Sequence, residues 1–408
     1  MKKYKDLIKN IGVLTLSNFG SKILSFLLVP LYTSILTTEE YGKFDFITVT
    51  ISLLIPILTL NITEAALRFL LDKKNAPKDI FEICLKTIII SIFILLIFVI
   101  VNQYLNIIPI LNVYNIFFVI YYIVSLNYEW AQNFTRGLDK LSNIAIGGII
   151  NSIFILFLNI LFLVIFKLGL KGYFLANIIA NIISTGYLLI STNIKQYIKF
   201  DTINVFCVSN KRLKKEMLKY SKPLMLNSIG WWINNVSDRY IVTYILGVAE
   251  NGIYSVAYKI PSILSIIQSI FNQAWAITAV KTFDKNDEDR FFESIYVSYN
   301  FLMVCCCSIL IILTKFLASI LYKNEFYNAW KYMPFLMISI VFSAISGLLG
   351  GIFSAVKNSK MMSVSTMVGA IINIILNFFL IHIVGTIGAA ISTAISCCIV
   401  WIIRMIRS

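Results

Sequence analysis

Charged residues are scarce in this 408-residue sequence, making up 13% of it, whereas hydrophobic residues make up 59%. A soluble domain carries about a quarter charged residues. The apolar runs repeatedly reach the ~20 residues that a helix needs to cross a bilayer. Backbone groups in lipid must be satisfied within each segment, and the short alternating segments of a membrane barrel are missing. The composition therefore predicts an all-α polytopic membrane protein.

Histidine is nearly absent, and the cysteines are few. The only histidine is His382, and none of the seven cysteines stands in a C-x-x-C or Cys/His metal spacing. No nucleophile–base constellation and no phosphate-binding glycine loop is present. We therefore expect no metal, no cofactor and no enzymatic activity. A lone histidine near a helix end is only a weak candidate for a proton relay.

Acidic residues are outnumbered by basic ones, 20 against 35, which gives a net charge of +15. In a soluble protein this excess would point to nucleic acid. In a membrane chain, Lys and Arg instead mark the cytoplasmic loops. If the N-terminus is cytoplasmic, most of the basic residues lie in segments on the cytoplasmic side of the membrane. We therefore expect both termini in the cytoplasm and no nucleic-acid partner.

About twelve apolar spans are predicted, and the longest hydrophilic segment separates them six and six. They lie at residues 9–36, 43–70, 81–101, 108–127, 142–166, 170–191, 219–246, 252–279, 294–320, 331–354, 362–382 and 385–403. This division predicts an N-terminal six-helix lobe at 1–191, a cytoplasmic linker at 192–216 and a C-terminal six-helix lobe at 217–408. The KRLKKE run at the end of the linker is either a solvated inside marker or a contact for anionic lipid headgroups.

The two halves share a weak internal repeat. Residues 17–46 align with residues 227–256 at a shift of 210, which places Gly42 on Gly252. Farther along, Gly169-x-x-Gly172 aligns with Gly385-x-x-Gly388. Chance similarity between isoleucine-rich helices is the alternative explanation. A true repeat predicts two pseudo-symmetric lobes around a central cavity, with the pseudo-two-fold axis along the membrane normal.

Pro56 and Pro261 each interrupt the second predicted span of a half. Proline removes a backbone donor and clashes with the preceding turn, so both positions predict kinks.

Residues 227–260 form two apolar spans joined by a short turn, and they contain Asp238, Arg239 and Lys259. Each charge costs roughly 2.5–3.5 kcal/mol at the bilayer centre, so such residues face a cavity or a partner. Asp238 and Lys259 lie at similar depth and fit an ion pair. Arg239, and Lys22 in the first span, are then surplus positive charge suited to an anionic substrate. The alternative is a structural ion pair with one snorkelling side chain.

Polar side chains elsewhere extend this candidate site. Trp231 and Asn235 share a helix face with Asp238, and such faces either line a cavity or form helix–helix contacts. Glu64 and Arg68 stand four residues apart near the inner end of the second span. They are either a local helix pair or part of a cytoplasmic gate.

The segment SDRYIVTYILGVAENGIYSVAYKI, residues 237–260, resembles the span 7–8 signature of Wzx-type polysaccharide flippases. These flippases belong to the multidrug/oligosaccharidyl-lipid/polysaccharide exporter superfamily. The resemblance rests on Asp238-Arg239, Gly247, Gly252-x-Tyr254-Ser255 and Ala257-Tyr258-Lys259. Weaker counterparts lie at residues 31–46, 64–70 and 136–140. Relatives often carry a proline after the Ala-Trp of span 8, whereas Ala276 follows Trp275 here, which puts any shared role of that tryptophan in doubt.

The resemblance implies translocation of an undecaprenyl-pyrophosphate-linked oligosaccharide repeat unit from the cytoplasmic to the outer leaflet, for O-antigen or capsule biosynthesis. It implies alternating access by two six-helix lobes around a cationic cavity, with a polysaccharide polymerase and glycosyltransferases as partners. The expected substrate-binding residues are Lys22, Arg68, Trp231, Asn235, Arg239 and Lys259, with Asp238 and Glu64 for coupling or ion pairing. The alternatives are a cation-coupled multidrug exporter of the same superfamily and a non-transport membrane scaffold.

Overall fold

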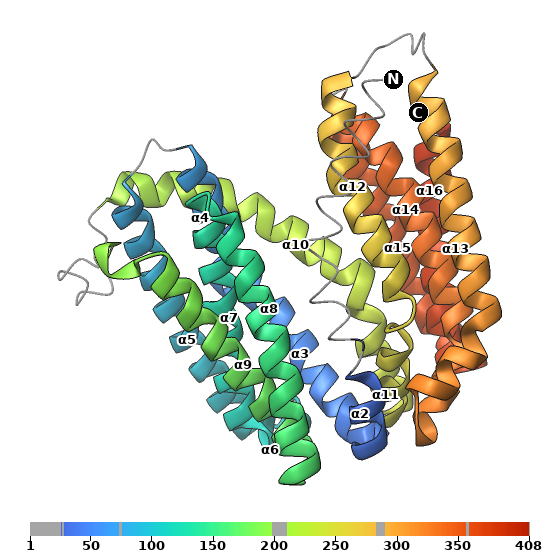
Figure 1. Cartoon of the computed structure of the whole chain (residues 1–408), viewed down its shortest axis with the longest axis horizontal. Helices are drawn as coiled ribbons and strands as arrows, with labels where there is room; N and C mark the ends of the chain where they lie inside the picture. Colours follow the sequence, from blue (N-terminus) through green and yellow to red (C-terminus); the bar gives the residue numbers. More distant parts are fainter. Residues whose placement is uncertain are drawn as a thin grey trace. The chain divides into compact units, whose positions relative to one another are not determined.

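The computed structural model describes residue 26 and residues 28–72, 76–197, 210–282, 290–355 and 359–407 (Figure 1). Within these ranges every regular element is a helix. The first half comprises α2 (Val29–Ile35), α3 (Thr38–Thr59), α4 (Ile62–Leu71), α5 (Pro77–Leu105), α6 (Pro109–Val113), α7 (Asn115–Gly137), α8 (Leu141–Asn159), the π-helical η1 (Ile160–Ile165), α9 (Gly169–Ser191) and η2 (Ile194–Tyr197). The second half comprises α10 (Lys211–Leu246), α11 (Val248–Ala257), α12 (Ser262–Thr282), α13 (Phe291–Leu321), η4 (Asn324–Lys331), α14 (Met333–Ala355), α15 (Ser359–Val384) and α16 (Thr386–Arg407).

Each predicted span from residue 43 onward coincides with one of these helices or with a consecutive pair. Eight described helices are long and apolar enough to cross a membrane, or nine if α11 and the start of α12 form one bent span. The predicted first span lies outside the described residues apart from residue 26 and its end at α2. The chain is therefore a multi-pass helical membrane protein.

The second predicted span of each half is broken. In the first half, α3 ends at Thr59 and α4 begins at Ile62. The two residues between them, Leu60 and Asn61, adopt left-handed conformations with φ of 51° and 56°. In the second half, α11 and α12 meet at an angle of 54° around Pro261. Proline supplies no N–H to the preceding turn, which accounts for the bend at Pro261. The kink predicted from Pro261 is confirmed, whereas α3 continues through Pro56 and the break follows at Leu60 and Asn61.

Tertiary contacts divide the chain into two compact units. Unit 1 comprises Met1–Phe46 and Ile233–Ser408, and unit 2 comprises Ile47–Trp232. The two divisions fall inside α3 and α10, so each of these helices contributes to both units. The sequence instead predicts uninterrupted lobes at residues 1–191 and 217–408, and those boundaries stay a prediction.

Unit 2 is a bundle in which α8 packs on α9, and α7 packs on α4 and α9 (Figure 1). Small residues such as Ala176 and Ala180 let α9 approach Leu158 of α8 closely. The first part of α10 joins the bundle through side chains, because Asn61 Nδ2 donates to Ser228 Oγ at 3.0 Å.

Unit 1 contains α11 to α16, together with α2 and the first turns of α3. In it, α3 and α11 approach each other through two glycines. A Cβ on Gly42 would lie 2.0 Å from the carbonyl oxygen of Val248, and one on Gly252 would lie 2.0 Å from that of Thr38. Thr38 and Val248 are themselves related by the shift of 210 residues. The contact is therefore reciprocal, as a two-fold internal repeat requires.

A second pair of turns supports the same repeat. Gly169 and Gly385 both adopt positive φ, at 54° and 70°. Three residues on, Gly172 and Gly388 each lie where a Cβ would meet a carbonyl oxygen of the preceding helix, at 3.1 and 2.4 Å. The weak sequence repeat thus corresponds to repeated structure.

Candidate functional site

A buried polar network occupies unit 1 where the last turns of α10 meet α11 and the first turns of α3. Its members are Asp45, Asp238, Arg239, Asn251, Tyr254 and Tyr258. The glycine crossing positions it, because Asp45 follows Gly42 by three residues and faces inward from the same end of α3. Asp238 is only 3% exposed and Asp45 is 8% exposed. Such charges need partners in a membrane protein.

The first half of the network is an ion pair between two helices. A terminal nitrogen of the Arg239 guanidinium lies 2.7 Å from Asp45 Oδ1. The other carboxylate oxygen of Asp45 accepts a hydrogen bond from Asn251 Nδ2 at 3.3 Å. Charge-assisted hydrogen bonds are the stronger kind, and they strengthen away from water. The sequence interpretation of Arg239 as surplus positive charge is therefore wrong, because Asp45 balances it.

The second half of the network surrounds Asp238. Tyr254 and Tyr258 are four residues apart on one face of α11 and its end, and each hydroxyl donates to Asp238 Oδ2 at 2.7 Å. Their oxygens lie 3.2 Å apart. The Arg239 guanidinium carbon lies 5.0 Å from the Tyr258 ring centroid, a cation–π distance that links the two halves.

The expected ion pair between Asp238 and Lys259 is not formed among the described residues. The hydroxyls of Tyr254 and Tyr258 donate hydrogen bonds to the Asp238 carboxylate instead. Lys259 is half-buried, and within the described ranges its amino group has no carboxylate within ion-pair distance. With Asp45 included, the site holds two carboxylates and two cations, so its formal charges balance, and the charge of Lys259 attracts that of Asp45 without a direct ion pair.

Two predicted residues, Glu64 and Arg68, lie in unit 2 near the break between α3 and α4. Both are exposed. Glu64 Oε2 accepts from Asn61 Nδ2 at 3.1 Å, whereas Arg68 pairs with Asp72, one turn farther along α4. The local Glu64–Arg68 pair is therefore replaced by two other contacts.

The remaining predicted residues are dispersed. Trp231 is 51% exposed in unit 2, and Asn235 is exposed in unit 1. Lys22 lies outside the described residues. Trp275 is buried in unit 1 and donates its indole N–H to the carbonyl of Leu348 at 2.9 Å, so its role here is packing.

Two buried or half-buried carboxylates are not among the site residues predicted from the sequence. Asp45 completes the unit 1 network, and Glu129 of α7 is half-buried and accepts from Thr63 Oγ1 at 3.1 Å. Both lie in or next to apolar runs, where an acid is a signal in its own right. The internal repeat does not point to Asp45, because at the shift of 210 residues Asp45 aligns with Ser255, which is not acidic. Among the described residues, no group of three or more His, Cys, Asp or Glu side chains is placed to hold a metal ion.

With this geometry established, the chain can be compared with known proteins. The family model described as polysaccharide biosynthesis protein matches residues 7–277, more than half of the chain. The chain belongs to the polysaccharide biosynthesis protein family. A second family model, MatE, matches residues 223–379. No curated protein gives a match.

Solved structures agree on the fold at low sequence identity. The lipid II flippase MurJ in an inward closed conformation superposes with a TM-score of 0.75 at 15% identity, covering 97% of this chain and 87% of MurJ. An inward-facing multidrug resistance MATE transporter of the MOP superfamily gives a TM-score of 0.72 at 11% sequence identity, covering 97% of this chain and 93% of that transporter. A MOP superfamily transporter from Pyrococcus furiosus gives a TM-score of 0.65 at 11% sequence identity, covering 99% of this chain and 96% of that transporter.

The fold is therefore the one shared by MurJ and the MATE transporters, with pseudo-symmetric lobes, as the resemblance to MOP superfamily flippases predicted. These relatives are transporters or flippases. That is consistent with the expectation that the polysaccharide biosynthesis family member described here is not an enzyme.

Proposed function

We propose that this protein translocates an undecaprenyl-pyrophosphate-linked oligosaccharide repeat unit across the bacterial inner membrane, from the cytoplasmic to the outer leaflet. The translocated unit supplies O-antigen or capsule biosynthesis, in which a polymerase and glycosyltransferases act beside it. The observation that carries the proposal is the match of residues 7–277 to the polysaccharide biosynthesis family. The fold shared with a lipid II flippase supports a lipid-linked substrate.

The diphosphate of this substrate binds at the unit 1 network. Lys259 supplies a half-buried cation that has no carboxylate partner among the described residues. Arg239 joins it once the diphosphate replaces Asp45, because a diphosphate carries more negative charge than one carboxylate. Asp238 remains with its tyrosines as the coupling carboxylate. The sequence assigns Lys22 to the same cationic lining.

The remaining predicted residues serve the path of the substrate. Arg68 and Glu64 lie beside the helix break at Asn61, at the end predicted to be cytoplasmic. Trp231 and Asn235, exposed on α10, contact the sugar units. The two lobes, residues 1–191 and 217–408, rock against each other to expose the substrate alternately, with both termini in the cytoplasm.

A second candidate is a cation-coupled multidrug exporter. The MatE match over residues 223–379 and the MATE fold favour it. So does the charge balance of the site, since Asp45 and Asp238 offer two buried carboxylates to a cationic drug. A cationic drug would, however, leave Lys259 facing a like charge.

The deciding experiment compares two activities of one preparation. Wild-type protein reconstituted in vesicles is expected to move a fluorescent undecaprenyl-pyrophosphate oligosaccharide, and a cationic dye is expected to remain where it is. Arg239→Ala should abolish the lipid movement and the surface polysaccharide of complemented cells at normal protein levels. Lys323→Gln, an exposed lysine on the turn after α13, is the control. Dye transport alone would establish the exporter, and neither activity would favour a scaffold.

A further inference from the structure

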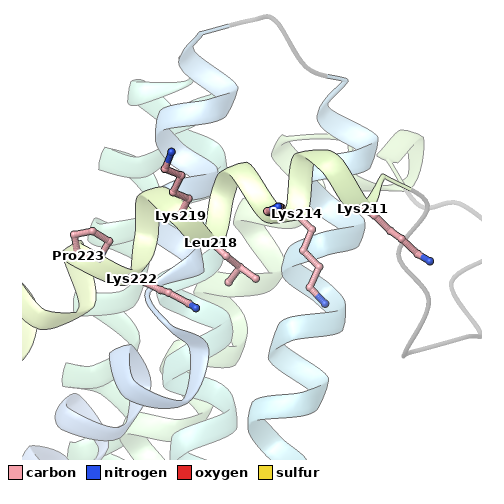
Figure 2. Close-up of a pocket in the computed structure, with 7 residues that line it drawn as sticks. Lys211, Lys214, Leu218, Lys219, Lys222 and Pro223 are labelled. Atoms are coloured by element: carbon pink, nitrogen blue, oxygen red, sulfur yellow. The ribbon is translucent and has the colours of Figure 1, made fainter.

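The first turns of α10 present a row of lysines along a groove. The groove has a volume of about 560 Å³ and is lined by Lys211, Lys214, Lys215, Leu218, Lys219, Lys222 and Pro223 (Figure 2). We call the five lysines the lysine strip. Lys211, Lys215, Lys219 and Lys222 are spaced by four, four and three residues, so they follow one side of the helix.

No direct ion pair neutralises the lysine strip within the described residues, although Asp79 of α5 lies beside its first lysine and accepts a hydrogen bond from Asn210 at 3.2 Å. Glu216 is the acidic residue within these turns, and it pairs with Arg212 at 3.1 Å. Among the described residues none of the five lysines forms an ion pair. A solvated run of lysines needs no partner, but five uncompensated cations along about three turns also create a concentrated positive potential.

The helix that carries the strip is held in place on its opposite side. Leu213, Met217 and Ser221 are buried in unit 2, and the ring of Tyr220 lies 6.1 Å from that of Phe69. The strip is therefore presented by an ordered helix with one packed face. A ligand that binds the lysines does not have to order the backbone first.

The length of α10 allows the strip to extend beyond the hydrocarbon of a bilayer. Its 36 residues extend about 54 Å at 1.5 Å per residue, whereas the hydrocarbon core of a bilayer is ~30 Å thick. The predicted span of residues 219–246 begins at the last two lysines of the strip, Lys219 and Lys222. The strip therefore lies at one end of this predicted span, and Leu218 and Pro223 add apolar side chains to the groove.

We propose that the lysine strip binds the phosphate groups of acidic phospholipids in the leaflet that it faces. A run of basic residues at the end of a predicted membrane span is the arrangement that anionic headgroups attract, and each such residue contributes about five-fold in affinity. The apolar residues within the strip match acyl chains, which a nucleic acid or a free phosphate would not use. This assignment does not depend on which substrate the protein carries.

The test uses the full-length purified protein and native mass spectrometry with phosphatidylglycerol or phosphatidylcholine. The variant Lys215→Gln/Lys219→Gln/Lys222→Gln removes three charges from the strip. The control Lys167→Gln/Lys171→Gln/Lys323→Gln removes three exposed lysines from other turns. We expect wild type and control to prefer phosphatidylglycerol, and the strip variant to bind it at least ten-fold more weakly. Raising the salt from 0.1 to 0.5 M should reduce the wild-type preference.

Three results would overturn the proposal. Equal phosphatidylglycerol binding by the strip variant and the control would place the lipid site elsewhere. Binding that is insensitive to salt would exclude a phosphate–lysine contact. Selective capture of a lipid-linked diphosphate with no preference between the two phospholipids would make the strip a substrate-loading surface instead.

Discussion

The guanidinium of Arg239 lies 2.7 Å from a carboxylate oxygen of Asp45, a residue 194 positions earlier in the chain. The pair joins the end of α10 to the first turns of α3, beside the crossing of Gly42 and Gly252. It also determines which charges are in direct contact, because Arg239 takes the ion-pair contact with Asp45 and Lys259 forms none among the described residues. The experiments below test this arrangement one contact at a time.

Neutralising Asp45 should cost stability. Asp45→Asn leaves a guanidinium that is 19% exposed facing an amide, and we expect a loss of about 1–3 kcal/mol, less than for a fully buried pair. Arg239→Gln should cost a similar amount, and the double variant should cost less than the sum of the two. Melting temperatures of the detergent-purified protein measure all three. Arg212→Gln breaks an exposed pair with Glu216 and should change little. Additive effects would mean that the pair contributes no coupling.

The two tyrosines should act as a unit on Asp238. Tyr254→Phe or Tyr258→Phe removes one of two hydroxyls that donate to the same oxygen, so each single variant retains a donor. The double variant leaves a buried carboxylate with neither hydroxyl, and a hydrogen bond to a charged group is worth about 1.5–3 kcal/mol. We expect vesicle transport to fall modestly in the single variants and steeply in the double one. Tyr299→Phe, which alters another buried tyrosine of unit 1, is the control. Full transport by the double variant would remove Asp238 from the coupling role.

The glycine crossing should tolerate no side chain. Gly42→Ala and Gly252→Ala each place a Cβ 2.0 Å from a backbone oxygen, so α3 and α11 must separate. Overpacking of this kind costs about 1–3 kcal/mol. Both variants should lower the melting temperature and transport to a similar degree, as their reciprocal contacts require. Gly230→Ala meets nothing within 4 Å and should be neutral or slightly stabilising. A harmless Gly42→Ala would show that the crossing is loosely packed.

Lys259 should matter for substrate more than for stability. Among the described residues its amino group has no ion-pair partner, so Lys259→Gln breaks no ion pair within them. We expect an unchanged melting temperature together with a higher half-saturating concentration of the lipid-linked diphosphate. Lys259→Arg keeps the charge and should retain much of the wild-type activity. A Lys259→Gln variant with wild-type saturation behaviour would exclude contact with the anion.

The sequence alone determined the architecture. Long apolar runs leave a helix as the way to satisfy the backbone in lipid, and Pro261 bends its span because proline lacks a backbone donor. The shift of 210 residues, read from Gly42 and Gly252, anticipated the pseudo-symmetric fold. These features are local or periodic in the sequence, so they can be predicted without knowledge of any tertiary contact.

Which charges meet was decided only by the tertiary structure. Asp45 and Arg239 are far apart in the chain and fall on unrelated positions of the repeat, so no spacing rule pairs them. Equal depth suggested Lys259 as the partner of Asp238, but the close approach of two glycines aligns α11 so that Tyr254 and Tyr258 reach the carboxylate first. An ion pair depends on distances of a few ångströms between helices, and those distances are set by side-chain packing that a single sequence does not display.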